Sequence, residues 1–119
     1  MKHNCDAIVV CCMDFRFQKY IRLWQEKELK RKTFDLVGFA GCTKNLTVII
    51  KQIEISVKLH GTENVYLIHH EDCGYYKDKS TFERHKKDLL KAEKKILSLF
   101  PKVKVKLFYL HLDGRFEAI

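Results

Sequence analysis

The stretch AIVVCCMDFR, residues 7–16, determines how the rest of the chain is interpreted. Residues 7–12 form a short apolar run rich in β-branched side chains, which is typical of a buried strand. Apolar residues then recur at helical spacing, at Phe17, Tyr20, Ile21 and Trp24. The sequence therefore predicts a strand followed by a helix, with polar side chains at their junction.

The alternation of strand and helix continues along the chain. Residues 34–37 form a second short apolar run, and a helical apolar stripe follows over residues 46–57. We expect Gly61 to end this helix in the left-handed conformation. Residues 64–69 predict a third strand, after which Ser80 is expected to cap a third helix that Pro101 stops.

The C-terminal residues predict further strands. Residues 102–107 alternate strictly between lysine and apolar side chains, which indicates a half-buried strand with a lysine face. Such a face usually protects the edge of a sheet from unwanted pairing. Asp113 and Gly114 lie between apolar residues, so the tail could turn back as a hairpin.

This order predicts an α/β fold in a single domain spanning residues 1–119. The sheet should be mostly parallel, with strand order 2-1-3-4, helices on both faces and a C-terminal strand or hairpin. In that order the first and third strands are neighbours, and the chain leaves them in opposite directions. A crevice therefore opens at their carboxyl ends, which is where we expect chemistry.

Length and composition exclude several classes of protein. The chain has 119 residues, with 46% hydrophobic and 32% charged side chains, which suits one folded domain. Its longest apolar run, residues 7–12, is far shorter than the ~20 residues of a membrane span. The start of the chain lacks a signal-peptide pattern, so a cytoplasmic location is expected. In that reducing compartment the five cysteines are free thiols or metal ligands rather than disulfides.

The net charge of +8 raises the question of nucleic-acid binding. The basic residues concentrate in residues 16–32 and 77–95, both of which are predicted helices. Lysine and glutamate share a solvated helix face in such segments, and exposed aromatic residues are not interleaved with them. We therefore expect neither a nucleic-acid partner nor a membrane partner. The small core of so short a domain favours a homodimer or higher homo-oligomer.

Two segments bring metal-binding side chains to the predicted crevice. Cys12 follows the first strand, whereas His70 and Cys73 follow the third. Two thiolates and one imidazole are a complete protein ligand set for a catalytic Zn²⁺, which keeps its fourth position for water or substrate. Asp14 would close the site if it became the fourth ligand. Taken singly, a cysteine at the end of a strand is most often a small buried hydrophobic residue.

The two segments together resemble the β-class carbonic anhydrases, whose motifs are Cys-x-Asp-x-Arg and His-x-x-Cys-Gly. They stand here as Cys12-Met13-Asp14-Phe15-Arg16 and His70-Glu71-Asp72-Cys73-Gly74. The resemblance, to a short and minimal member, implies reversible hydration of CO₂ to bicarbonate by a zinc-bound hydroxide. It further implies Cys12, His70 and Cys73 as zinc ligands, Asp14 and Arg16 as catalytic residues, and a homo-oligomer.

Some positions depart from the family pattern and leave alternatives open. Gly38 and Phe39 stand where the family usually has Arg-Asn, and Cys42 follows closely as either a buried side chain or an extra thiolate. A hydrolase of COS or CS₂ on the same zinc site, and a non-catalytic zinc domain with a closed site, therefore remain alternatives. No proton shuttle is singled out, because strand alternation points His69 away from His70, into a structural or solvent-facing position.

Overall fold

The computed structural model describes residues 3–119. Its strands are β1 (Ala7–Cys11), β2 (Phe34–Gly38), β3 (Asn64–His70), β4 (Lys104–Leu110) and β5 (Phe116–Ala118). Its α-helices are α1 (Gln18–Glu28), α2 (Leu46–His60) and α3 (Phe82–Leu99), and two short 3-10 segments span Phe15–Phe17 and Gly74–Lys79. The predicted alternation of strands and helices is confirmed.

The strands form one sheet in the order β2-β1-β3-β4-β5. Strand β1 pairs in parallel with both β2 and β3, and β3 pairs in parallel with β4. The last residue of β1, Cys11, lies opposite Ile68, two residues before the end of β3. The loops that follow β1 and β3 therefore meet at one edge of the sheet, as the predicted strand order requires.

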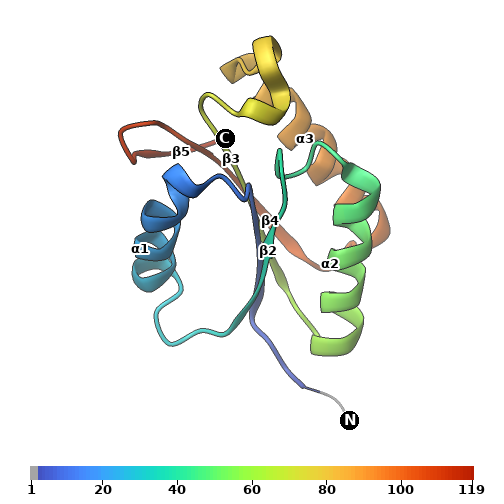
Figure 1. The fold of residues 1–119 in the computed structure, drawn as a ribbon. Coiled ribbons are helices and arrows are strands. Elements are labelled where there is room, and N and C mark those ends of the chain that lie inside the picture. Colours follow the sequence, from blue (N-terminus) through green and yellow to red (C-terminus); the bar gives the residue numbers. More distant parts are fainter. Residues whose placement is uncertain (1–2) are drawn as a thin grey trace.

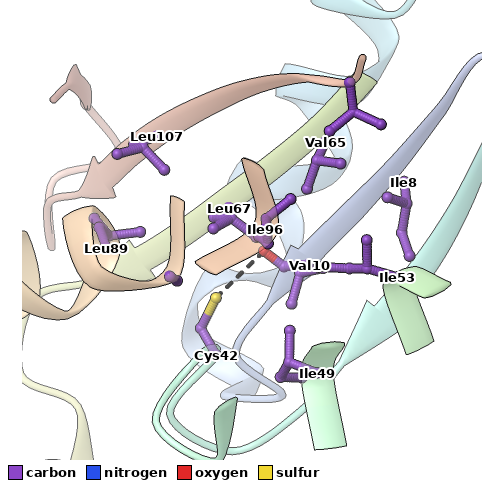
Figure 2. Packing of buried hydrophobic residues seen from close by; sticks show 12 residues of the cluster. Ile8, Val10, Cys42, Ile49, Ile53, Val65, Leu67, Leu89, Ile96 and Leu107 are labelled. Atoms are coloured by element: carbon purple, nitrogen blue, oxygen red, sulfur yellow. Dashed lines mark hydrogen bonds between the residues drawn. The ribbon is translucent and has the colours of Figure 1, made fainter. Parts of the chain in front are cut away.

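Helices cover both faces of the sheet, with α1 on one face and α2 and α3 on the other (Figure 1). Ile49 and Ile53 of α2 and Leu89 and Ile96 of α3 are fully buried against the second face (Figure 2). Burying one such side chain contributes about 2 kcal/mol. On the first face, Ile21 and Trp24 of α1 pack in a separate cluster with Phe17. Two cores thus fix the sheet between its helices.

The sheet edge differs from the sequence prediction. Strand β4 keeps its exposed lysines, but it is not the edge along its whole length, because β5 pairs antiparallel with residues 108–110. The predicted C-terminal hairpin is therefore present, and it covers the half of β4 that lacks lysine. In the described residues no strand other than β3 pairs with the other half of β4, which carries the lysines. That half therefore lies at the edge of the sheet, as the lysine alternation of residues 102–107 predicted.

The start of α3 also differs from the prediction. Thr81, not Ser80, caps the helix: its Oγ1 accepts a hydrogen bond from the backbone N–H of Arg84 at 3.2 Å. Both residues carry a hydroxyl that could serve as a cap. The Ser80 hydroxyl is engaged elsewhere, because it accepts a hydrogen bond from the backbone N–H of Cys73 at 2.9 Å. The predicted end of α2 is correct, since Gly61 adopts φ 63° and donates to the Val57 carbonyl.

Gly114 in the β4–β5 turn leads to a stability prediction. It adopts φ +91°, and a Cβ built on it would lie 2.5 Å from the Tyr20 ring of α1. The Gly114→Ala change should therefore lower the free energy of unfolding by about 2 to 4 kcal/mol, because backbone strain and ring displacement add. Gly38→Ala is the matched control, since nothing lies within 4 Å of its Cβ. Urea denaturation of both variants tests this, and equal losses would contradict it.

Candidate metal centre

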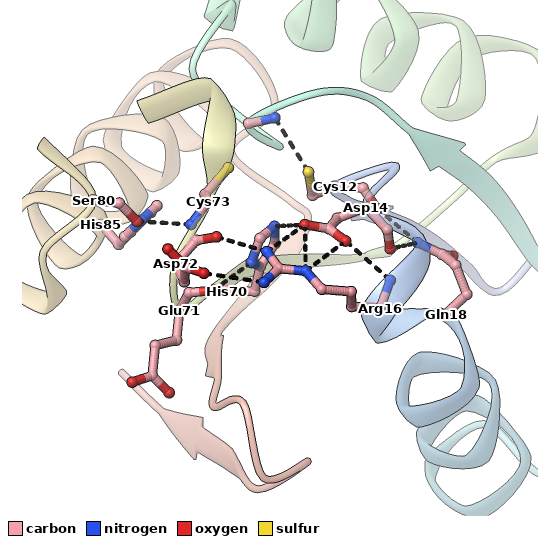
Figure 3. A network of polar contacts seen from close by, with 11 residues as sticks. Cys12, Asp14, Arg16, Gln18, His70, Glu71, Asp72, Cys73, Ser80 and His85 are labelled. Atoms are coloured by element: carbon pink, nitrogen blue, oxygen red, sulfur yellow. Dashed lines mark hydrogen bonds and ion pairs between the residues drawn. The ribbon is translucent and has the colours of Figure 1, made fainter. Parts of the chain in front are cut away.

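Three metal-binding side chains meet where β1 and β3 end. Cys12 directly follows β1, His70 is the last residue of β3, and Cys73 lies in the loop beyond it. One ligand atom from each residue lies within 4.8 Å of the others, and all three residues are buried (Figure 3). The structure thus brings together the three residues that the sequence suggested as metal ligands.

The His70 ring is oriented for a ligand. Its Nδ1 lies 2.7 Å from the Glu71 carbonyl oxygen, so Nδ1 carries the proton and Nε2 keeps a free lone pair. Nε2 is buried and has no hydrogen-bond partner. In residues 3–119 only one other buried side-chain nitrogen or oxygen lacks a partner. The Phe17 ring packs against the imidazole at 4.2 Å between centroids. An orphaned, fixed imidazole nitrogen between two sulfurs fits a bound zinc ion.

The Cys12 sulfur lies in an environment that favours thiolate. Its pKa is lowered, chiefly because the Cys73 thiol donates a hydrogen bond to it. The backbone N–H of Gly41 also points at Sγ, at 3.4 Å. Thiolate is the form that binds metal. The loop after β2 therefore contributes a hydrogen bond that favours the thiolate of this candidate ligand.

Asp14 and Arg16 form a close ion pair beside these side chains. Arg16 Nη2 lies 2.8 Å from Asp14 Oδ2, and the Arg16 backbone N–H donates to Asp14 Oδ1 at 2.9 Å. These hydrogen bonds from Arg16 lower the pKa of Asp14, so the carboxylate is ionised at neutral pH. Asp14 Oδ2 lies 3.9 Å from His70 Nε2, close to the ligands but held by the guanidinium. Asp14 thus lies next to the three candidate ligands while its carboxylate is paired with Arg16.

Arg16 also joins the two motifs. Its Nη1 lies 3.0 Å from Asp72 Oδ2, and its Nη2 donates to the Asp72 carbonyl oxygen at 2.8 Å. Asp72 adopts φ 56°, a conformation that is uncommon outside glycine. The sequence placed Asp72 beside the ligands but did not indicate this pairing, which depends on that backbone turn. Arg16 thereby fixes the loop that carries Cys73 to the loop that carries Asp14.

The two other cysteines near the cluster are buried side chains that do not belong to it. Cys42 is fully buried, and its Sγ donates to the Val10 carbonyl oxygen at 3.4 Å (Figure 2). Burial raises the pKa of this thiol well above its ordinary value. Cys11 points into the core around α1, and its pKa is raised to about 12 by burial. Neither belongs to the cluster of Cys12, His70 and Cys73.

His69 is structural, and the solvent-facing alternative is wrong. It is 1% exposed, and its two ring nitrogens lie 2.7 Å from Thr43 Oγ1 and 2.8 Å from His85 Nδ1. The partner of His69 on α3 is His85. It is buried on the first turns of α3, and nothing in the sequence indicates a partner sixteen positions earlier.

The burial of His85 predicts acid sensitivity. Its pKa falls from 6.5 to about 4, chiefly through burial; Arg84 lowers it further, whereas Asp88 opposes the shift. Between these pH values the unfolded chain binds a proton that the folded chain does not. The free energy of unfolding should therefore fall as pH drops from 6.5 to 4, by an amount on the order of 2 kcal/mol, with no such loss above 6.5.

Urea denaturation of metal-free protein at pH 7, 6 and 5 measures this slope. In a His85→Gln variant the slope should be shallower, because glutamine takes up no proton in this range. Parallel slopes for the two proteins would refute the assignment.

A protein family model described as "Putative carbonic anhydrase" matches residues 2–119. The chain belongs to this family. The structure is also similar to those of two solved carbonic anhydrases. Its TM-score is 0.61 to the carbonic anhydrase from Glaciozyma antarctica, at 17% identity, and 0.63 to that from Streptococcus mutans, at 20% identity. Each comparison covers 99% of this chain and 83% of the other, and at these identities it shows the shared fold.

Similar sequences also include proteins with and without a named activity. An uncharacterized protein of Rickettsia bellii is 30% identical over 138 residues, covering 98% of this chain and 83% of the relative. Beta-carbonic anhydrase 1 of Mycobacterium tuberculosis is 36% identical over 66 residues, covering 56% of this chain and 37% of that protein. The membership of the carbonic anhydrase family agrees with the resemblance seen in the two motifs. In the described residues no helix is long and apolar enough to cross a membrane.

Proposed function

We propose that this chain is a zinc carbonic anhydrase that interconverts CO₂ and bicarbonate. One observation carries the proposal: the buried cluster of Cys12, His70 and Cys73 lies beside an Asp14 carboxylate that Arg16 holds. Two thiolates and an imidazole select zinc over magnesium or calcium. Three protein ligands leave the fourth tetrahedral position for water or substrate.

The three ligands would hold the metal, and the ion supplies a Lewis acid that lowers the pKa of water to about 7. Cys12 enters as the thiolate, since its pKa is already lowered in the metal-free protein. His70 presents Nε2, because Nδ1 donates to the Glu71 carbonyl. In the net reaction the water oxygen bonds to the CO₂ carbon, one C=O electron pair moves to oxygen, and one proton leaves to solvent.

Asp14 would orient the attacking water. Its carboxylate is ionised at neutral pH, so it accepts a hydrogen bond and leaves an oxygen lone pair directed towards the carbon. The bonds from Arg16 occupy both carboxylate oxygens, which disfavours movement of Asp14 onto the metal. This restraint supports an open site over the closed, non-catalytic alternative.

The proposed assembly is a homo-oligomer in a reducing compartment such as the cytoplasm. Met13 and Phe15 flank Asp14 and are 67% and 85% exposed, so they present apolar surface beside the site. A second copy of the chain would bury it. Reducing conditions suit the free thiols of Cys12 and Cys73. Sedimentation of the protein, and of a Phe15→Asp variant that should dissociate, tests the assembly.

The substrate is tested by an assay of one zinc-quantified preparation with CO₂, COS and CS₂. Turnover of CO₂ that azide inhibits is expected, because an anion competes for an open metal position. Turnover of COS or CS₂ without CO₂ hydration would replace this proposal with a hydrolase. Full zinc occupancy with no azide binding would indicate a closed site instead.

A further inference from the structure

A chain of hydrogen bonds runs from Thr43, in the loop between β2 and α2, to the backbone of Cys73. Thr43 Oγ1 lies 2.7 Å from His69 Nε2, and His69 Nδ1 lies 2.8 Å from His85 Nδ1. His85 Nε2 lies 2.9 Å from Ser80 Oγ, which accepts the backbone N–H of Cys73 at 2.9 Å. The link between Ser80 and Cys73 is drawn in Figure 3. We call this chain the histidine relay.

The histidine relay is a buried and fully paired network. His69 and His85 are each 1% exposed and Thr43 is 3% exposed, so water does not compete for their nitrogens. All four ring nitrogens have a polar partner, and the two facing Nδ1 atoms share a single proton. Burial lowers the pKa of both rings, so each is neutral at pH 7 and in one tautomer set by its neighbour. A network of this kind rigidifies the groups at its ends.

Aromatic packing locks the relay in place. The Tyr76 ring lies 4.3 Å from the His85 ring and 5.9 Å from the His69 ring, between centroids. The Tyr76 hydroxyl donates to Asp88 Oδ2 at 2.5 Å, which ties the ring to α3. The backbone N–H of Tyr76 also donates to the Cys73 carbonyl at 3.0 Å. The backbone N–H and carbonyl of Cys73 are thus hydrogen-bonded to Ser80 and Tyr76, and both of these residues contact His85.

We propose that His85 is a positioning residue for the metal centre: through Ser80 it fixes the backbone of Cys73, so that the Cys73 sulfur meets Cys12 and His70. This inference rests on the proposed metal site. The loop that carries Cys73 has two strained residues, Asp72 at φ 56° and Lys77 at φ 55°. Such a loop needs outside contacts to stay in one conformation. Arg16 supplies them at Asp72, and the histidine relay supplies them at Cys73.

Three variants separate positioning from mere stability. His85→Leu removes both hydrogen bonds of the ring, Ser80→Ala removes only the link to Cys73, and His85→Gln keeps an amide that reaches Ser80. Leu89→Ala is the matched control, because Leu89 is a fully buried residue of α3 outside the relay. It should lower the Tm without affecting the position of Cys73.

The first readout is zinc affinity, measured by competition with a chelator on protein shown by circular dichroism to be folded. His85→Leu and Ser80→Ala should weaken zinc binding about tenfold or more, the usual cost of losing a partner that orients a ligand. His85→Gln should recover most of the loss, and Leu89→Ala should bind zinc within about twofold of the parent. Parental affinity in both His85→Leu and Ser80→Ala would overturn the proposal. If His85→Leu does not fold, the zinc affinity of Ser80→Ala alone tests the proposal, because Ser80 is only half-buried.

The second readout does not depend on metal. In the metal-free protein the Cys73 amide should exchange with deuterium slowly, and exchange should become about tenfold faster in Ser80→Ala and His85→Leu. Unchanged exchange in both variants would refute the positioning role. A parent protein that binds no zinc would instead refute the proposed function, while the amide exchange still tests the histidine relay by itself.

Discussion

Replacement of Cys73 by serine is expected to abolish stoichiometric zinc binding and, with it, CO₂ hydration. A serine hydroxyl remains protonated at neutral pH, so the metal loses one of two thiolates. Loss of a residue that merely orients a ligand already costs 10- to 100-fold in affinity, so loss of the ligand should cost at least about a hundredfold. Zinc content after gel filtration, measured by atomic absorption, checks the result.

Two other cysteines provide the matched controls for this prediction. Cys5→Ser removes a half-buried thiol near the N-terminus, and Cys42→Ala removes a fully buried one in the loop between β2 and α2. Neither residue belongs to the cluster, so both variants should retain about one zinc per chain, although Cys42→Ala should be less stable. If Cys42→Ala lost its zinc and Cys73→Ser retained it, the ligand assignment would be wrong.

Replacement of Asp14 by asparagine should lower kcat for CO₂ hydration about a hundredfold while zinc stays bound. The amide keeps the size of the side chain but loses the charge that Arg16 neutralises and the strong acceptor that orients water. Removal of one group that stabilises a transition state typically costs 10²- to 10³-fold in kcat. Stopped-flow assays on zinc-quantified protein provide the measurement.

Asp72→Asn is the control for Asp14→Asn, because Asp72 is the other carboxylate paired with Arg16. Its side chain is 68% exposed, and Arg16 also holds its backbone carbonyl, which the substitution leaves in place. We expect a loss in kcat of at most about threefold, as for an exposed ion pair. An equal loss in the two variants would mean that Asp14 serves only to anchor Arg16. Loss of zinc in Asp14→Asn would contradict its proposed role outside the ligand set.

Much of the fold and the centre of the site could be predicted from the sequence, because both depend on regular elements. The β-branched apolar run at residues 7–12 favours a strand, and the stripe at residues 46–57 favours a helix. Once β1 and β3 are neighbours in a parallel sheet, Cys12 and His70 must meet at the carboxyl ends. Gly61 ends α2 as expected, since a left-handed cap is the ordinary use of glycine there.

The details that could not be predicted depend on tertiary contacts. Ser80 and Thr81 are adjacent hydroxyl residues, and only the presence of the Cys73 N–H decides which of them caps α3. Asp72 meets Arg16 only because its backbone turns to φ 56°. His85 carries no sequence signal, since its partners His69 and Ser80 come from other elements.

The central claim is tested most directly by the rate of CO₂ hydration between pH 6 and 9, on protein of known zinc content. A rate above background that rises with pH through about 7 to 8, and that is absent in Cys73→Ser, is the predicted result. No activity at any pH despite one zinc per chain would contradict the assignment of this chain as a carbonic anhydrase.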